Sequence, residues 1–124
     1  MKKKDWYSEA EYEELYKNNY EKLEEIRRFL HGYCDEWVLN NFRPNDTAII
    51  WCDYDDVTNK TYLIHCYIIR NGYFVDIRGK TKSIELIEEE YDYGEFERKI
   101  YCTTLEEFKA HIRNICGYLD NKWQ

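Results

Sequence analysis

The stretch from Thr61 to Gly79 constrains the fold most, because two runs of β-branched and aromatic residues flank Asn71-Gly72 within it. Asn-Gly between apolar runs predicts a two-residue type I′ turn, since both central residues of that turn need positive φ. The turn fixes which residues of the hairpin lie opposite one another. The expected pairs are Arg70 with Tyr73, Ile69 with Phe74, Tyr67 with Asp76, and His65 with Arg78.

This register predicts a histidine with a carboxylate beside it. Side chains alternate between the two faces of a strand, so His65, Tyr67, Asp76 and Arg78 share one face. Asp76 is then the diagonal cross-strand neighbour of His65, within reach of a side-chain hydrogen bond. Cys66 points to the opposite face.

The overall composition indicates one ordinary globular domain. The chain has 124 residues, and its 44% hydrophobic content argues against disorder although 35% of the residues are charged. No run of eighteen apolar residues occurs, and residues 1–6 lack an apolar segment, so we expect neither a transmembrane helix nor a signal peptide. Five cysteines without a CxxC pair favour reduced thiols, and therefore a cytoplasmic location.

The net charge of −7 bears on the kind of partner. Proteins that bind the phosphate backbone need a basic stripe, so we expect no nucleic-acid partner, and we expect no membrane partner either. An acidic surface also serves solubility alone. The sharper alternative is that it docks on a basic protein.

Helical and strand patterns alternate along the chain in a way typical of an α+β domain. We expect a flexible N-terminal arm over residues 1–8 and a single domain over residues 9–124. In that domain, N-terminal helices pack on a small antiparallel β-sheet, and a C-terminal helix follows. Besides the hairpin, the predicted elements are helices over 9–30, 34–42 and 83–91, strands over 47–54 and 96–102 (the latter at an edge), and a helix from 105 to about 119. Capping boxes at Ser8–Glu11 and Thr104–Glu107 start the first and last helices.

Cys34 is the cysteine best placed for nucleophilic chemistry. It follows Gly32 at the start of a predicted helix, where backbone N–H groups lower a thiol pKa and stabilise an oxyanion. His65 would take the thiol proton, Asp76 would orient the imidazole, and the Cys34 amide would supply part of the oxyanion hole. The alternatives remain that Cys34 is a small hydrophobic core residue and His65 a hydrogen-bonded core histidine.

Two segments carry a resemblance to a known superfamily. Gly32-Tyr33-Cys34-Asp35-Glu36-Trp37 resembles the opening of the nucleophile helix in papain-like cysteine proteins. The segment from His65 to Gly79 resembles the histidine-to-aspartate segment of small bacterial and phage members, which include NlpC/P60-like and transglutaminase-like proteins. The resemblance covers about residues 30 to 80. It implies a thiol-dependent hydrolase or acyl or amide transferase that acts on a peptide, amide or protein substrate.

Two departures from that pattern support an alternative function. Papain-type enzymes place a glutamine before the cysteine, whereas the only glutamine here is Gln124. Asp35 and Glu36 lie beside the expected nucleophile and would raise its pKa. The alternative is a non-catalytic acidic phage or mobile-element protein that binds and inhibits a host protein.

The remaining cysteines and histidines are assigned structural positions. We expect Cys52, Cys66, Cys102 and Cys116 in the core, and the two other histidines, His31 and His111, at the surface or at helix ends. Cys52 and Cys66 with a histidine lack zinc-ligand spacing, and no phosphate-binding glycine motif occurs. We therefore expect neither a cofactor nor a metal.

Overall fold

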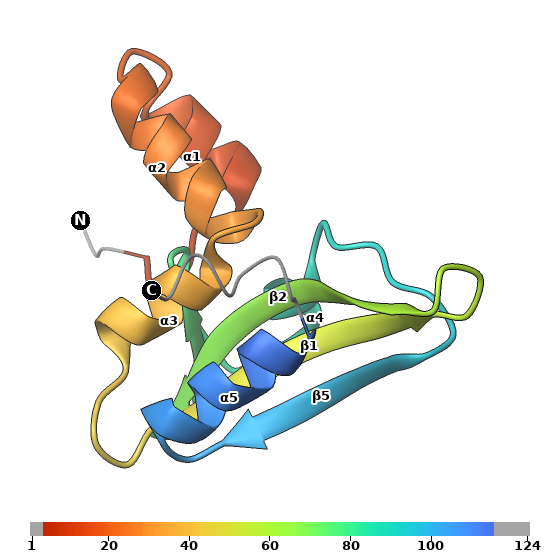
Figure 1. Cartoon of the computed structure of the whole chain (residues 1–124). Helices are drawn as coiled ribbons and strands as arrows, with labels where there is room; N and C mark the ends of the chain where they lie inside the picture. The colour runs from red at the N-terminus through yellow and green to blue at the C-terminus, as the bar shows by residue number, and fades with distance from the viewer. Residues whose placement is uncertain (1–3, 116–124) are drawn as a thin grey trace.

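The computed structural model describes residues 4–115, which form a mixed α+β fold around a five-stranded antiparallel sheet of order β4-β3-β2-β1-β5 (Figure 1). The strands are β1 (Thr47–Asp55), β2 (Lys60–Arg70), β3 (Tyr73–Asp76), β4 (Gly79–Thr81) and β5 (Glu97–Cys102). The helices are α1 (Glu9–Leu15), α2 (Tyr20–Leu30), α3 (Cys34–Asn41), α4 (Ile84–Glu88) and α5 (Leu105–Ile115). The α+β class and the edge position of β5 are confirmed.

The predicted hairpin forms, but its pairing is shorter than expected. Asn71 and Gly72 have φ values of 52° and 81°, as a type I′ turn requires. The pairs Arg70–Tyr73 and Ile69–Phe74 are confirmed, whereas the ladder between β2 and β3 ends at Ile68–Val75. The predicted pairing of His65 with Arg78 is wrong, because the chain turns after Asp76 and returns as β4.

Residues 4–8, in the segment predicted as a flexible arm over residues 1–8, make specific contacts with the start of β4. Trp6 is buried and bridges to Gly79, and the Lys80 amide donates to the Asp5 carbonyl at 2.8 Å. Gly79 has a φ of +125°, and a Cβ there would lie 2.0 Å from the Asp5 carbonyl oxygen. Only glycine therefore allows the N-terminal segment to pack this closely, and the bulk of Trp6 gives that segment apolar area to bury.

The single helix expected over residues 9–30 is interrupted, so that prediction is also wrong. Ser8 and Glu11 form the expected capping box of α1, but α1 ends at Leu15. The Asn19 side chain then caps α2 by accepting from the Lys22 amide. Asparagine favours caps over helix interiors, so the apolar spacing alone was a poor guide here. The hairpin of α1 and α2 projects beyond the sheet (Figure 1).

Each face of the sheet carries its own apolar cluster. On one face, α3 and α5 pack over a cluster that includes Ile50, Ile68 and Phe108; on the other face, Trp51 and Tyr67 pack with Ile87 of α4. The predicted core cysteines Cys52, Cys66 and Cys102 are buried, and Cys116 lies outside the described residues. The part of the predicted last helix beyond residue 115 also lies outside them. Within residues 4–115, no helix is long and apolar enough to cross a bilayer.

Candidate functional site

His65 of β2 and Asp76 at the end of β3 lie together, as the hairpin register predicts. The His65 Nε2 atom is 2.9 Å from the Asp76 Oδ2 atom, and both side chains are buried. The hydrogen bond forms beyond the last paired residues of β2 and β3, where the two strands separate. A carboxylate on one ring nitrogen fixes the orientation of the imidazole and leaves Nδ1 to face other groups.

Arg78 holds Asp76 in place. Its guanidinium donates from Nε and Nη2 to the Asp76 carboxylate, at 2.8 Å for Nη2, and its backbone amide donates to the same carboxylate at 2.7 Å. The Nη2 group also donates to the Ile87 carbonyl at 2.8 Å, and the guanidinium lies 4.6 Å from the ring centroid of Trp6. The sharp turn after Asp76 therefore folds Arg78 back onto the preceding carboxylate, and this buried charge is paired and hydrogen-bonded.

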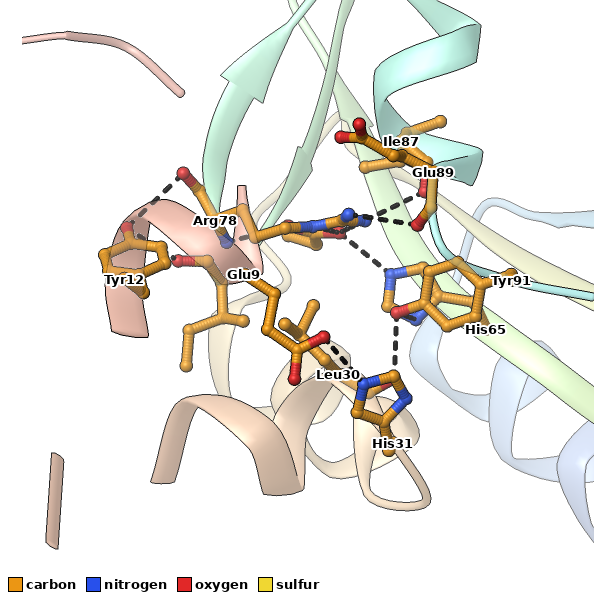
Figure 2. A network of polar contacts seen from close by, with 11 residues as sticks. Glu9, Tyr12, Leu30, His31, His65, Arg78, Ile87, Glu89 and Tyr91 are labelled. Carbon is orange, nitrogen blue, oxygen red and sulfur yellow. Dashed lines mark hydrogen bonds and ion pairs between the residues drawn. The ribbon is translucent and has the colours of Figure 1, made fainter. Parts of the chain in front are cut away.

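Tyr91 covers the imidazole from the segment between α4 and β5 (Figure 2). Its hydroxyl lies 2.8 Å from the Leu30 carbonyl oxygen and 3.0 Å from the His65 Nδ1 atom, and its ring stacks on the imidazole at 4.5 Å between centroids. A carbonyl oxygen only accepts, so the single hydroxyl proton is donated to Leu30. The hydroxyl oxygen then accepts from Nδ1. The Nε2 atom donates to Asp76 in the same way. Both ring nitrogens of His65 therefore carry a proton, which means that the side chain is an imidazolium when both hydrogen bonds are made.

Cys34 completes the cluster from the first position of α3. A hydrogen bond with Cys66 and interactions with His65 lower the pKa of Cys34 to about 5, against the opposing effect of burial. The negative charge of Asp35 raises the pKa of Cys34, as the sequence predicts, but this effect is smaller than the lowering. The thiol also packs in the apolar cluster with Cys66 and Val38, on the face of the sheet that α3 covers.

The four charged groups balance one another. Burial alone would lower the pKa of His65, but the hydrogen bond with Asp76 and the neighbouring Cys34 thiol raise it above its ordinary value. Burial would raise the pKa of Asp76, but its bonds with His65 and Arg78 lower it. A thiolate, an imidazolium, a carboxylate and a guanidinium give each buried charge an opposite charge beside it, and the buried Asp35 adjoins Cys34 as a further acidic group.

The site is closed in this structure. Cys34 is 1% exposed, His65 0% and Asp76 3%. Tyr91 is half-buried, but the residues on either side of it, from Glu89 to Phe96, are exposed. His31 contacts Tyr91 and bonds to Glu9 of α1 at 3.1 Å, so the α1–α2 hairpin borders the same covering residue (Figure 2). A reagent therefore reaches the thiol or the imidazole only if the structure opens locally.

The sequence identified three of the five residues that form this cluster. The structure brings Cys34, His65 and Asp76 together, while their catalytic roles stay predictions. Arg78 was placed on the correct side of the hairpin but opposite His65, and its bond to Asp76 was missed. Tyr91 was missed altogether, because it is 26 residues from His65 and no local pattern connects the two.

No family model matches the chain, and no curated protein or solved structure matches it. The resemblance to papain-like proteins therefore stays a prediction that rests on the residues themselves.

Proposed function

We propose that this protein is a thiol-dependent hydrolase or acyl transferase of papain-like architecture, in which Cys34 is the nucleophile. The observation that carries the proposal is a thiol with its pKa lowered to about 5, in contact with a histidine that is itself bonded to a carboxylate. Strong pKa perturbation by specific partners is typical of functional sites. His65 is the general acid and base, and Asp76 is the positioning carboxylate.

The arrangement suits acyl transfer. The Cys34 thiolate attacks the acyl carbon, and the carbonyl oxygen of the substrate becomes an oxyanion at the start of α3, near the Cys34 amide. Asp76 and Tyr91 occupy both ring nitrogens of His65 in the closed structure. Once Tyr91 has moved away, the imidazolium gives its Nδ1 proton to the leaving amine or alcohol, which yields a thioester on Cys34 and neutral His65. Neutral His65 next deprotonates water or another acceptor, which attacks the thioester and releases the thiolate. The proton returns His65 to the imidazolium.

Because the site is closed, a substrate can enter it only if Tyr91 moves. Its segment makes few buried contacts, since its neighbours from Glu89 to Phe96 are exposed. Regions of this kind open locally at low free-energy cost. We therefore expect substrate to enter where Tyr91 lies against His65, with the Leu30–Tyr91 hydrogen bond broken.

The proposal is tested by trapping the acyl intermediate. The protein is incubated with a p-nitrophenyl ester or a small activated thioester, and the acylated residue is located by peptide mass spectrometry. We expect acylation at Cys34, its loss in His65→Ala, and faster acylation in Tyr91→Ala. Cys102→Ala is the matched control, because it removes a buried thiol elsewhere and should leave the rate unchanged.

Two outcomes would overturn the proposal. One is that Cys34 stays unmodified even in Tyr91→Ala while that variant remains folded. The other is that Cys34 is acylated equally fast with and without His65, since the histidine would then not activate the thiol.

A second candidate is a non-catalytic protein that binds a basic protein partner through the α1–α2 hairpin. The observation in its favour is the projecting surface of that hairpin, where Tyr20 is 71% exposed and Leu15 56% exposed. Acidic residues surround them, namely Glu13, Glu14, Glu21, Glu24 and Glu25. In this case the buried cluster only stabilises the fold. Binding would survive Cys34→Ala and be lost in Tyr20→Ala, whereas acyl transfer shows the reverse pattern.

Both candidates suit a reducing compartment such as the cytoplasm. The four described cysteines are free thiols, and the enzyme needs Cys34 reduced.

A further inference from the structure

Three metal-ligating side chains meet at the junction of β5 and α5, away from the site described above. Cys102 is the last residue of β5, and Glu107 and His111 lie one turn apart on α5. One ligand atom from each, the thiol sulfur, a carboxylate oxygen and a ring nitrogen, all lie within 4.8 Å of one another. Cys102 is buried, His111 is half-buried and Glu107 is exposed.

The local sequence explains why these groups converge. Only Thr103 and Thr104 separate β5 from α5, and the Thr104 hydroxyl accepts from the Glu107 amide at 3.1 Å. This cap fixes the start of the helix directly after the strand. Residues four apart in a helix lie on one face, so Glu107 and His111 both face the same side as the end of β5. Backbone geometry thus brings the three ligands together before any ion binds.

These side chains have no other polar partner in the described part of the chain. Within residues 4–115, no hydrogen bond or ion pair engages the Cys102 thiol, the Glu107 carboxylate or the His111 ring. By contrast, His31 is bonded to Glu9 and His65 to Asp76. The cluster is therefore not part of a structural network in the way that the other two histidines are.

We propose that Cys102, Glu107 and His111 bind Zn²⁺, with water as the fourth ligand. A thiolate, an imidazole and a carboxylate are the ligand types that tetrahedral Zn²⁺ sites use. With bonds of about 2.3 Å to sulfur and about 2.1 Å to nitrogen and oxygen, tetrahedral ligand atoms lie roughly 3.4–3.6 Å apart. Rotation of the exposed Glu107 and the half-buried His111 closes the remaining distance of about 1 Å.

The electrostatics of the cluster also favour a cation. A Cys102 thiolate and the Glu107 carboxylate together need a positive charge beside them. Zn²⁺ supplies that charge and displaces the thiol proton, which leaves to solvent. A site with three protein ligands and one water keeps an open position, as catalytic Zn²⁺ sites do.

Cobalt is the probe for this proposal, because Co²⁺ takes zinc sites and its bond to a thiolate gives a near-ultraviolet charge-transfer band. The full chain is reduced, freed of metal and titrated with Co²⁺, and Zn²⁺ is then added to displace the cobalt. We expect the thiolate–cobalt band with one equivalent of Co²⁺. The band should be lost in Cys102→Ser and retained in Cys34→Ser, which removes the other thiol that contacts a histidine.

Surface variants keep the test informative if the buried Cys102→Ser fails to fold. Glu107→Gln and His111→Gln should each weaken Zn²⁺ binding by about tenfold or more, measured by competition with a chromogenic chelator. Glu106→Gln is the matched control, because it removes a neighbouring exposed carboxylate outside the cluster and should leave the affinity unchanged. Absence of the band in the intact protein, or its persistence in Cys102→Ser, would overturn the proposal. So would equal effects of Glu106→Gln and Glu107→Gln.

Discussion

Cys34 and Cys102 are both buried free thiols, yet their environments shift their pKa values in opposite directions. The pKa of Cys34 is lowered to about 5, by hydrogen bonds with Cys66 and His65. The pKa of Cys102 is raised to about 11, by burial and by the negative charge of Glu107. Burial disfavours the thiolate at both positions, so the difference comes from the neighbours. Hydrogen bonds with Cys66 and His65 outweigh burial at Cys34, whereas at Cys102 burial and Glu107 act in the same direction.

The largest effect is expected where the charge balance around Cys34 is broken. Asp76→Asn keeps the shape of the side chain but leaves Arg78 and His65 without their common anion. Removing one partner of a buried ion pair costs roughly 3–5 kcal/mol, so we expect a loss of this size in the free energy of unfolding, measured by urea denaturation. The control is Asp46→Asn, because Asp46 pairs with Arg70, whose side chain is 19% exposed. That variant should lose about 1 kcal/mol. Equal losses would contradict the account.

The stability contributed by Cys34 and His65 should depend on pH, unlike that contributed by Cys102. In the unfolded chain, histidine and cysteine titrate at about 6.5 and 8.5. Below pH about 6.5 the histidine of the unfolded chain binds a proton. The folded pair binds its next proton, on Cys34, only near pH 5. The unfolded state is therefore favoured as the pH falls, and the free energy of unfolding decreases. The raised pKa of folded His65 contributes stability that is present below pH about 6.5 and is lost as the pH rises through that raised pKa.

Between pH about 6.5 and about 5 the pair therefore loses about 2 kcal/mol of its contribution to the free energy of unfolding. Urea denaturation of the intact protein and of Cys34→Ala across pH 5 to 10 measures this. This loss of stability on the acid side should be missing in the variant. If the free energy of unfolding changed with pH in the same way in both proteins, the pKa of Cys34 would be that of an ordinary cysteine.

Tyr91→Phe should produce a smaller loss. It removes the hydroxyl that bonds the Leu30 carbonyl and His65 Nδ1, and it leaves both groups unsatisfied. We expect a loss of about 1–2 kcal/mol in the free energy of unfolding, together with faster alkylation of Cys34 by iodoacetamide. Unchanged alkylation would argue that Tyr91 does not control access.

The smallest effect is expected at Cys102. Cys102→Ala removes a small buried group and no charge at neutral pH, so about 1 kcal/mol should be lost. Because its folded pKa of about 11 lies above that of an unfolded cysteine, the thiol carries its proton in both states below pH about 8. The loss should therefore be constant from pH 5 to pH 8 in thermal or urea unfolding. A loss that changes across this range would contradict the assignment.

The local part of the site could be predicted from sequence, and the part that depends on tertiary packing could not. Asn71-Gly72 determines a turn, the turn determines a register, and the register brings His65 to Asp76. The position of Cys34 follows from Gly32, which ends α2 just before α3. Tyr91 depends on how a distant segment crosses the sheet, and no short-range pattern encodes that crossing.

The wrong predictions about the fold also concern contacts between residues far apart in the sequence. The pairing beyond Asp76 fails because Trp6 and Asp5 occupy the position where β4 turns back, and a contact between residues 5 and 79 leaves no trace in hairpin periodicity. The preference of asparagine for helix caps indicates the helix break at Asn19. The apolar residues on both sides of Asn19 have helical spacing, however, and this spacing predicts one continuous helix.

The most direct test of the account is a titration of the Cys34 thiolate itself. The ultraviolet absorbance of thiolates is followed with pH in the folded protein, and the contribution of Cys34 is the difference between the intact chain and Cys34→Ser. This reading does not require a reagent to enter the closed site. The account predicts a Cys34 thiolate that persists at pH 7 and is protonated near pH 5. A Cys34 thiolate that appears only above pH about 8.5 would contradict it, because the thiol would then be an ordinary buried cysteine.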